Sequence, residues 1–319
     1  MNKKIALVLI LLFGAGLNSF AQTNSTPGAP TAAIVAAAKK FLATLDAAQR
    51  GKVVFDFKDE AQRKRWSNLP TAIFKRQGLR MGDLTKPRRE AALLVLAAAL
   101  SPQGYEKVLQ IVVADELLRK SSGQTMFGRE EYYVSFLGQP STAEPWMIQF
   151  GGHHLGLNIT LAGEQRTLAP SHTGAQPAIY ELEGKTVRPL GRETDKAFAL
   201  LSSLDEAQRK QTILDFQVRD LVLGPGRDGQ TIQPEGIKGS ALTEKQRQLL
   251  LDLASEWTGI MHEAVAKAKM DEMNRNIAET WFAWSGPIEK GSAAYFRIQG
   301  PTVIIEYAPQ RLGVKYGVD

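Results

Sequence analysis

Two stretches of this chain, 159 residues apart, repeat the same series of residues. Residues 41–50 read FLATLDAAQR and residues 200–209 read LLSSLDEAQR, and in both cases Asp-Phe follows after five intervening residues. In both copies an Asp stands three residues before a Gln, the pattern of a capped helix N-terminus. The repetition therefore predicts two pseudo-repeated halves that use the same elements in the same order.

The repetition continues farther along the chain, where residues 146–159 align with residues 294–307 at an offset of 148. This alignment places His154 opposite Thr302 and Asn158 opposite Glu306. Each half begins with helical apolar spacing and ends with segments typical of strands and turns. Because helices and strands do not alternate regularly, we expect an α+β fold in which antiparallel β-hairpin strands follow the helices of each half.

The N-terminus has the pattern of a secretory signal peptide. Lys3 and Lys4 precede a short apolar run, and Ser19 and Ala21 are the small residues of a cleavage site after Ala21. The run is too short for a membrane span, so we expect a secreted or periplasmic protein with no membrane span after cleavage. The predicted division is residues 1–21 as signal peptide, 22–31 as flexible leader, 32–190 as the first half and 191–319 as the second half, with the two halves able to form one compact body.

Positive charge is concentrated in one part of the chain. Residues 58–89 hold ten basic and three acidic side chains, and Arg63, Lys64 and Arg65 are consecutive. Such a segment is typical of a solvated helix face or of a surface that binds an anionic partner. For an exported protein that partner would be an anionic cell-envelope ligand, and we do not expect nucleic acid.

Three of the four histidines lie close together in the sequence, at positions 153, 154 and 172. If residues 150–158 form one strand, alternation puts His153 on the apolar face and His154 on the polar face with Asn158. His154 is then the first candidate for a site, followed by His172 and His153, with Asn158 as a candidate ligand-binding residue.

The histidines are open to three interpretations. They can bind a divalent transition metal such as zinc, with Glu144, Glu181 or Glu306 as a further ligand. They can act as metal-free acid–base groups. They can also be structural, with His153 packed in the core and the other two hydrogen-bonded to loops.

Several familiar motifs are absent or unconvincing. Residues 224–229 match the spacing of a dinucleotide-binding loop, but the glycines run into further loop residues rather than into a helix, so we expect a turn. The chain has no serine-hydrolase elbow and no zincin motif. Trp146, Trp281 and Trp284 next to turn residues fit either an aromatic ligand platform or core packing.

An ordered set of motifs resembles domain-of-unknown-function family 3500 over nearly the whole mature chain. The motifs are RWSNLP (65–70), RQGL (76–79), LSPQGY (100–105), FLGQP (136–140), GHHLGLN (152–158), and YFRIQGP (295–301) followed by IEY (305–307). The resemblance implies a mixed α and β fold and, in many members, an export signal. It implies no reaction and no cofactor.

One departure from the family pattern concerns the C-terminus. Members typically follow the Ile-Glu-Tyr strand with a His-x-His segment, whereas residues 308–319 contain no histidine, through natural divergence or truncation. The sequence thus predicts an exported protein of unknown molecular function that binds a divalent metal through His154 and His172. The alternatives are a metal-assisted hydrolase of the cell envelope and a non-catalytic binding module for an anionic envelope ligand, with Trp146 and the 63–65 cluster as contacts.

Overall fold

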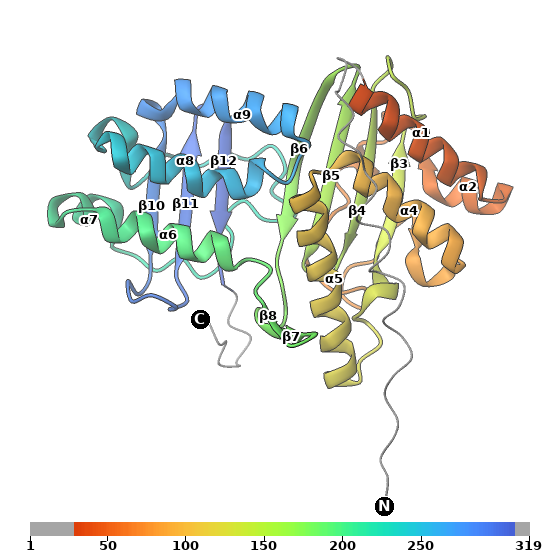
Figure 1. Cartoon of the computed structure of the whole chain (residues 1–319), viewed down its shortest axis with the longest axis horizontal. Coiled ribbons are helices and arrows are strands. Elements are labelled where there is room, and N and C mark those ends of the chain that lie inside the picture. Colours follow the sequence, from red (N-terminus) through yellow and green to blue (C-terminus); the bar gives the residue numbers. More distant parts are fainter. Residues whose placement is uncertain (1–28, 310–319) are drawn as a thin grey trace, which may run out of the picture.

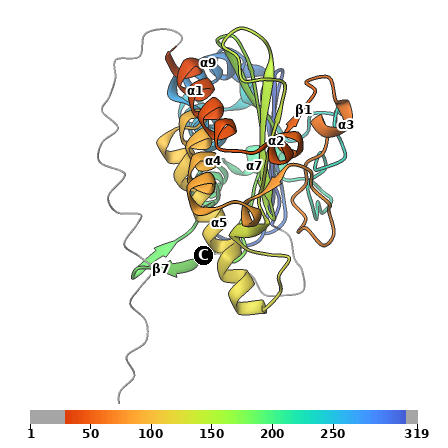
Figure 2. The ribbon, with the colours of Figure 1, turned by 90° about the vertical axis from the view of Figure 1, so that its right-hand side faces the viewer.

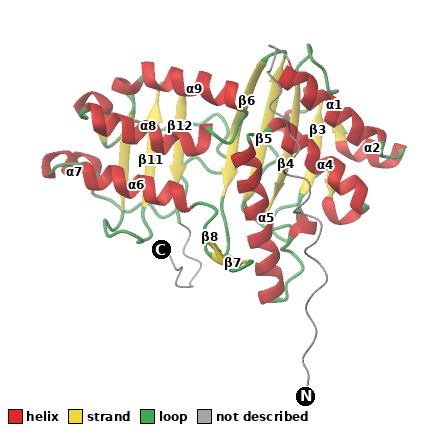
Figure 3. Ribbon diagram, in the orientation of Figure 1, coloured by secondary structure: helices red, strands yellow, loops and turns green. Residues whose placement is uncertain are grey.

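A computed structural model of the protein describes residues 29–309, and it has two sheets side by side with helices packed on one face of each (Figures 1 and 3). Viewed from the side, the other face of the sheets is covered mainly by loops and by the short helices α2 and α3 (Figure 2). Helices and strands are segregated and nearly all strand pairs are antiparallel, so the expected α+β class is confirmed.

The elements follow one another in two similar series. The first is α1 (Ala29–Ala43), α2 (Ala47–Val53), β1 (Val54–Phe55), α3 (Glu60–Arg63), β2 (Leu79–Arg80), η1 (Met81–Asp83), α4 (Lys86–Ala99), α5 (Pro102–Ser122), η2 (Arg129–Glu131), β3 (Tyr133–Leu137), β4 (Trp146–Gly152), β5 (Leu155–Ala162), β6 (Gln165–Thr173), β7 (Tyr180–Leu182) and β8 (Lys185–Val187). The second is α6 (Gly191–Ser203), α7 (Glu206–Thr212), β9 (Ile237–Lys238), η3 (Gly239–Ala241), α8 (Glu244–Thr258), α9 (Glu263–Arg275), η4 (Ile277–Glu279), β10 (Trp281–Ser285), β11 (Tyr295–Gly300) and β12 (Val303–Tyr307).

The larger sheet has the strand order β1-β3-β4-β5-β6, with β2 also paired to β3, and the smaller sheet has the order β12-β11-β10-β9. Strands β7 and β8 form a separate hairpin. Within the part of the chain that the structure describes, β6 pairs only with β5 and β12 pairs only with β11. These two outer strands lie next to each other where the sheets meet (Figure 1).

The repeated Asp-x-x-Gln pattern forms the same local structure in both places. Asp46 caps α2 and Asp205 caps α7, each in a capping box with the glutamine three residues on. After α2, Val54 pairs in parallel with Phe136, and after α7, Ile213 forms a parallel bridge with Trp284. These correspondences agree with the alignment of the two segments, although the duplication and the boundary at residue 190 stay predictions.

The core is divided between the two sheets. One buried cluster surrounds β3 to β5 and includes Trp146, and the other surrounds β10 to β12 and includes Trp284. Trp146 is fully buried against Phe136, with ring centroids 5.9 Å apart. Of the two interpretations of Trp146 and Trp284, the structure therefore supports core packing.

The halves are joined through the turns between their paired helices. Ser101, between α4 and α5, donates its Oγ hydrogen to the carbonyl of Gly259, 2.6 Å away, and its N–H to the carbonyl of Ile260. Leu100 and Met261 form an antiparallel bridge at the same place. Any side chain at Gly104 would overlap the backbone of Ile260, since a Cβ there would lie 2.2 Å from its carbonyl oxygen. This close contact holds the α4–α5 turn against the α8–α9 turn.

The predicted signal peptide lies outside the described residues. Helix α1 begins at Ala29, so residues 29–31 belong to a helix and not to the flexible leader expected there. Among residues 29–309, no helix combines the length and the apolar character that a bilayer span requires.

Candidate ligand-binding cleft

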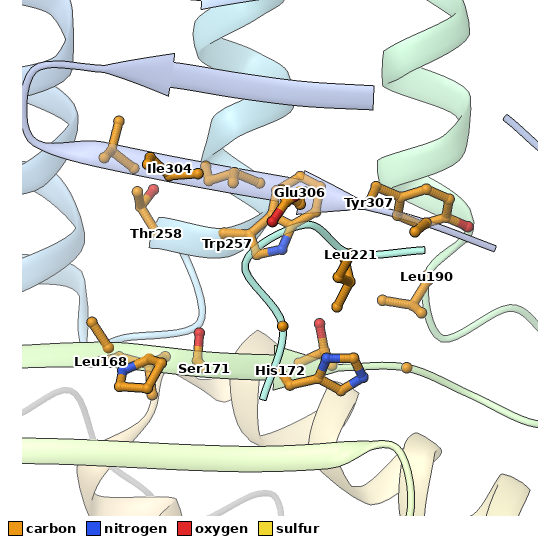
Figure 4. Close-up of a pocket in the computed structure, with 18 of the residues that line it drawn as sticks. Leu168, Ser171, His172, Leu190, Leu221, Trp257, Thr258, Ile304, Glu306 and Tyr307 are labelled. Carbon is orange, nitrogen blue, oxygen red and sulfur yellow. The ribbon is translucent and has the colours of Figure 1, made fainter. Parts of the chain in front are cut away.

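A cavity of about 630 Å³ lies between β6 and β12, within the size range of small-molecule sites (Figure 4). Residues 166–173 of β6 form one wall and residues 303–307 of β12 form the other. Trp257 and Thr258 at the end of α8 line the helix side. The opposite side is lined by Leu221, Leu223 and Gly224, which belong to residues 217–236, a segment without helix or strand that we call the strap.

The strap is held to the second half by Glu306 of β12. The Glu306 carboxylate accepts hydrogen bonds from the backbone N–H groups of Val222 and Leu223 at 2.9 and 2.8 Å. It also accepts one from the Tyr295 hydroxyl at 2.6 Å. The sequence makes Glu306 a candidate metal ligand, but in the structure its carboxylate positions the strap.

The strap also reaches the first half. The indole Nε1–H of Trp66 donates to Oδ1 of Asp228 at 3.1 Å. Trp66 itself lines the cleft. The strap therefore crosses the cleft and is hydrogen-bonded on both sides of it.

His153 and His154 do not lie in a strand. They are the two turn residues between β4, which ends at Gly152, and β5, which begins at Leu155. His154 has a φ of +59°, and the two imidazole rings are side by side with centroids 3.8 Å apart. The expectation that alternation sends the two side chains to opposite faces of a sheet is therefore wrong, because the chain reverses direction at these residues.

His153 is a structural residue of the turn. Its Nδ1 lies 2.7 Å from Oδ1 of Asp115, and its carbonyl accepts a hydrogen bond from the buried Tyr132 hydroxyl at 3.0 Å. Its ring also packs against Phe127, with centroids 4.8 Å apart. The side chain is buried and does not line the cleft.

His154 and His172 line the cleft together. A Cβ at Gly174 would lie 3.3 Å from both His154 Nδ1 and His172 Nε2, so the two rings border the same small space. The other ring nitrogen of His154, Nε2, is 3.3 Å from Oε1 of Gln176. A donor at Nε2 would leave a lone pair on Nδ1, facing this space.

Both of these histidines are uncharged at neutral pH. Burial, and next the charge of His153, lowers the pKa of His154 to about 3. Burial lowers the pKa of His172 to about 4, partly opposed by the negative charge of Asp220. Each ring therefore offers one hydrogen-bond donor and one acceptor, and a base with so low a pKa is poorly matched to proton transfer near pH 7.

The charged side chains that line the cleft all have partners within the protein. Arg166 donates to Thr31 and lies 3.6 Å from Glu164, while its buried Nη1 has no hydrogen-bond partner among the described residues. Arg188 pairs with Asp195 at 2.9 Å. Lys269 pairs with Glu272 at 2.9 Å. Glu306 is bound to the strap, as described above. The cleft therefore presents mainly neutral groups to a ligand, among them His154, Ser171 and His172. His172 lies across from Glu306 and Tyr307 (Figure 4).

Asn158 lies elsewhere, inside the larger sheet. It is 1 % exposed, its Oδ1 accepts from Gln149 at 3.0 Å and its Nδ2 donates to the carbonyl of Pro170 at 2.8 Å. Gln149 in turn binds Ser135 and Gln62. Asn158 thus belongs to a buried ladder of polar groups that attaches α3 to the sheet.

The basic cluster is likewise apart from the cleft. Arg63 lies over the ring of Phe57, 4.7 Å from its centroid, and donates to the Phe57 carbonyl. Lys64 forms an exposed pair with Glu60, and Arg65 donates to the carbonyl of Lys75. None of the three lines the cleft.

The three-ligand metal site expected from the histidines is not formed by the described residues. Glu181 accepts a hydrogen bond from Thr186 on the β7–β8 hairpin, and Glu306 holds the strap. Within residues 29–309, no group of three His, Cys, Asp or Glu side chains has a geometry suited to a metal ion. The structure therefore brings together His154 and His172, but no third ligand from the protein.

Most lining residues could not be found by sequence reasoning, among them Trp66, Gln176, Trp257 and Thr258. These four come from a loop, the segment after β6 and the end of α8, and no spacing in the sequence connects them. Only Trp66 carried a signal, since it stands in one of the motifs of the family resemblance.

Fold and cleft together define an α+β protein with a ligand-sized cleft between two sheets. The chain belongs to a family described as "Protein of unknown function (DUF3500)", whose model matches residues 27–315. The resemblance found in the motifs is thereby confirmed. Neither a comparison with curated proteins nor a comparison with solved structures gives a match.

Proposed function

We propose that this protein binds an uncharged organic ligand non-covalently in the cleft between β6 and β12. The observation that carries the proposal is the cleft of about 630 Å³ in which each charged lining side chain already binds another group of the protein, while neutral groups are left for the ligand. Its apolar lining from Leu168, Leu190, Leu221 and Ile304 would provide most of the binding energy.

The balance of charge in the cleft favours an uncharged ligand over the anionic one considered from the sequence. A charged ligand would lose its hydration and would compete with the protein groups that already bind each charged lining side chain, and such burial is costly. His172 would provide directional hydrogen bonds, because its neutral ring lines the cleft and carries one donor and one acceptor nitrogen.

A binding screen tests this proposal. A panel of uncharged compounds, such as end-blocked amino-acid amides, monosaccharides and medium-chain alcohols, is assayed for thermal stabilisation, and hits are titrated by calorimetry. Replacing His172 by Ala is expected to weaken binding of a hit about three- to tenfold, the effect of one lost hydrogen bond. His262→Ala is the matched control, since His262 precedes α9 and does not line the cleft. A panel without any hit, or hits unaffected by His172→Ala, would contradict the proposal.

A second candidate function is binding of a transition metal by His154 and His172. It is favoured by two neutral imidazole rings that border the same space, since neutral imidazole is the form that ligates metals. The remaining ligands would come from solvent or from a bound molecule. A hydrolase would need these additional ligands as well as a general base.

Metal content separates this candidate from the first. The protein is purified without chelator or affinity tag, and its metal is measured by elemental mass spectrometry beside His154→Asn. Near-stoichiometric zinc, copper or iron that is lost in the variant would support a metal site. Equal traces in both proteins, also after reconstitution, would rule it out.

We also propose that the protein acts outside the cytoplasm, because residues 1–21 have the pattern of a signal peptide. Cell fractionation and N-terminal sequencing of the mature protein test this, with cleavage expected after Ala21. An uncleaved cytoplasmic protein would refute it.

A further inference from the structure

The two walls of the cleft are the unpaired edges of two sheets. In an outer strand, every second residue directs its N–H and C=O groups away from its neighbour strand. Among residues 29–309, no strand pairs with the facing edges of β6 and β12. The walls therefore offer main-chain donors and acceptors to whatever occupies the space between them.

The two strands also run in the same direction. Residue numbers increase the same way along both, from Leu168 to His172 on β6 and from Ile304 to Tyr307 on β12 (Figure 4). One added strand between them can thus be antiparallel to both walls, the arrangement that both sheets already use.

The edge of β12 is weakly protected against pairing over residues 303–305, ahead of the charged Glu306. Edge strands are commonly protected by charged side chains, proline or bulges. Residues 303–305 of β12 are Val-Ile-Ile, and Ile304 is 37 % exposed. Strand β6 is less open, since it contains Pro170 and an irregularity in its pairing with β5. The edge of β12 is therefore the main site for pairing.

The other two sides of the cleft fit the alternating side chains of an extended chain. Successive residues of a strand point to opposite faces. One face of an added strand would meet Trp257 and Thr258 of α8, and the other would meet Leu221 and Leu223 of the strap. These surroundings suit apolar and small uncharged side chains, in agreement with the paired charges of the lining.

We infer that the ligand of the cleft is an extended peptide with uncharged side chains, bound as an additional strand between β12 and β6. This inference rests on the proposed function and narrows its ligand from uncharged organic molecules to peptides. Main-chain hydrogen bonds to the two edges would give affinity, and the α8 and strap sides would select side chains, as in other cases of strand addition.

Backbone-modified peptides provide the test. The probe is a pool of end-blocked pentapeptides built from Ala, Val, Thr and Ser, and the best binder is then made with N-methyl groups at its odd or at its even backbone nitrogens. A strand between two edges uses all of its N–H groups, so both methylated analogues are expected to bind at least about tenfold more weakly. Amide hydrogen exchange is expected to slow on β6 and β12 when the unmodified peptide binds. Strand β9, the other outer strand of the smaller sheet, is the control and should not change.

The outcomes separate this inference from the proposed function. If modified and unmodified peptides bind equally well, and His172→Ala abolishes the binding of both, strand addition would be overturned while the proposed ligand-binding function would stand. The same holds if other uncharged compounds bind and no peptide of the pool does. Absence of every binder would overturn both proposals. A dimer in sedimentation experiments that protects the same two edges without peptide would show that a second copy of the chain is the occupant, and would also overturn the inference.

Discussion

His154 combines an unusual backbone conformation with a position in the cleft wall. Its φ of +59° is uncommon for any residue other than glycine, and is a genuine outlier for β-branched residues. The turn needs this conformation because β4 and β5 are joined by only two residues. The geometry of the cleft wall therefore depends on a backbone conformation that few side chains tolerate.

Two substitutions at His154 are expected to show how much the positive φ of this residue matters for stability, because both remove the imidazole ring. His154→Asn keeps a residue that adopts positive φ, whereas His154→Val introduces a β-branched one. We expect the valine variant to be less stable than the asparagine variant by about 1–2 kcal/mol. Urea denaturation of the two proteins measures the difference. Equal stabilities would show that the turn relaxes to another conformation.

The lowered pKa values of His154 and His172 predict a loss of stability in mild acid. In the unfolded chain both side chains titrate near pH 6.5, while in the folded protein they do so at about 3 and 4. Between these values the unfolded state binds protons that the folded state does not. The contribution of the two histidines to the free energy of unfolding is therefore fully present above about pH 6.5. It decreases as the pH is lowered, by about 2 kcal/mol per histidine at pH 5.

The corresponding measurement is urea denaturation at pH 7 and pH 5 of the protein and of its His154→Asn, His172→Gln double variant. The double variant is expected to lose much less stability between the two pH values. An identical loss in both proteins would mean that other groups cause the acid sensitivity.

At the scale of elements, Glu306 connects a strand to the strap. Its two carboxylate oxygens accept from Val222 and Leu223, and such charge-assisted bonds are stronger than neutral ones. Glu306→Gln replaces one acceptor oxygen by an amide that can only donate. We expect amide hydrogens of the strap near these two residues to exchange about tenfold faster in the variant.

The control for this experiment is Glu289→Gln, a change in the turn between β10 and β11. It should leave the exchange of the strap unchanged. A strap that exchanges equally fast in all three proteins would show that its other contacts, such as those of Asp228 and Ser285, are sufficient to hold it.

Several elements could be predicted from the sequence, since their signals are local. The Asp-x-x-Gln pattern marked the capped starts of α2 and α7, and the glycines at 224–229 form a loop as expected. The histidine turn was missed because His-His is not a common turn pair and the flanking residues alternate like a strand. The cleft could not be predicted, because it joins residues as distant as Trp66 and Glu306 through tertiary contacts only.

At the scale of the whole molecule, a buried group of charges links the halves. Lys107 of α5 lies between Glu193 of α6 and Glu256 of α8, and all three side chains are buried. Glu256 is also paired with Lys196 and Arg192. Because the two glutamates belong to the second half and Lys107 to the first, the halves depend on each other for the neutralisation of buried charge.

Removing this lysine is expected to destabilise the whole protein. Lys107→Met leaves Glu193 buried without its partner, at a cost of about 3–5 kcal/mol in the free energy of unfolding. Adding Glu193→Gln to Lys107→Met should restore part of the lost stability, because the buried carboxylate is then replaced by a neutral amide. Urea denaturation gives the values, and Lys267→Met, which breaks the exposed pair with Asp271, is the control with an expected change below about 1 kcal/mol. If Lys107→Met lowered the free energy of unfolding no more than Lys267→Met does, a structural role for the buried charges around Lys107 would be contradicted.

The hydrogen bond from Trp66 to Asp228 has a practical consequence as well. The indole borders the cleft and contacts the tip of the strap, whereas Trp146 and Trp284 are enclosed in the two cores. A molecule that enters the cleft beside Trp66, or that displaces the strap, is expected to change the polarity around this indole and with it the wavelength of its emission, as it would for Trp257 in the same lining. The protein thus carries a natural fluorescent reporter at its own candidate site, and occupancy can be followed in solution without attaching a dye.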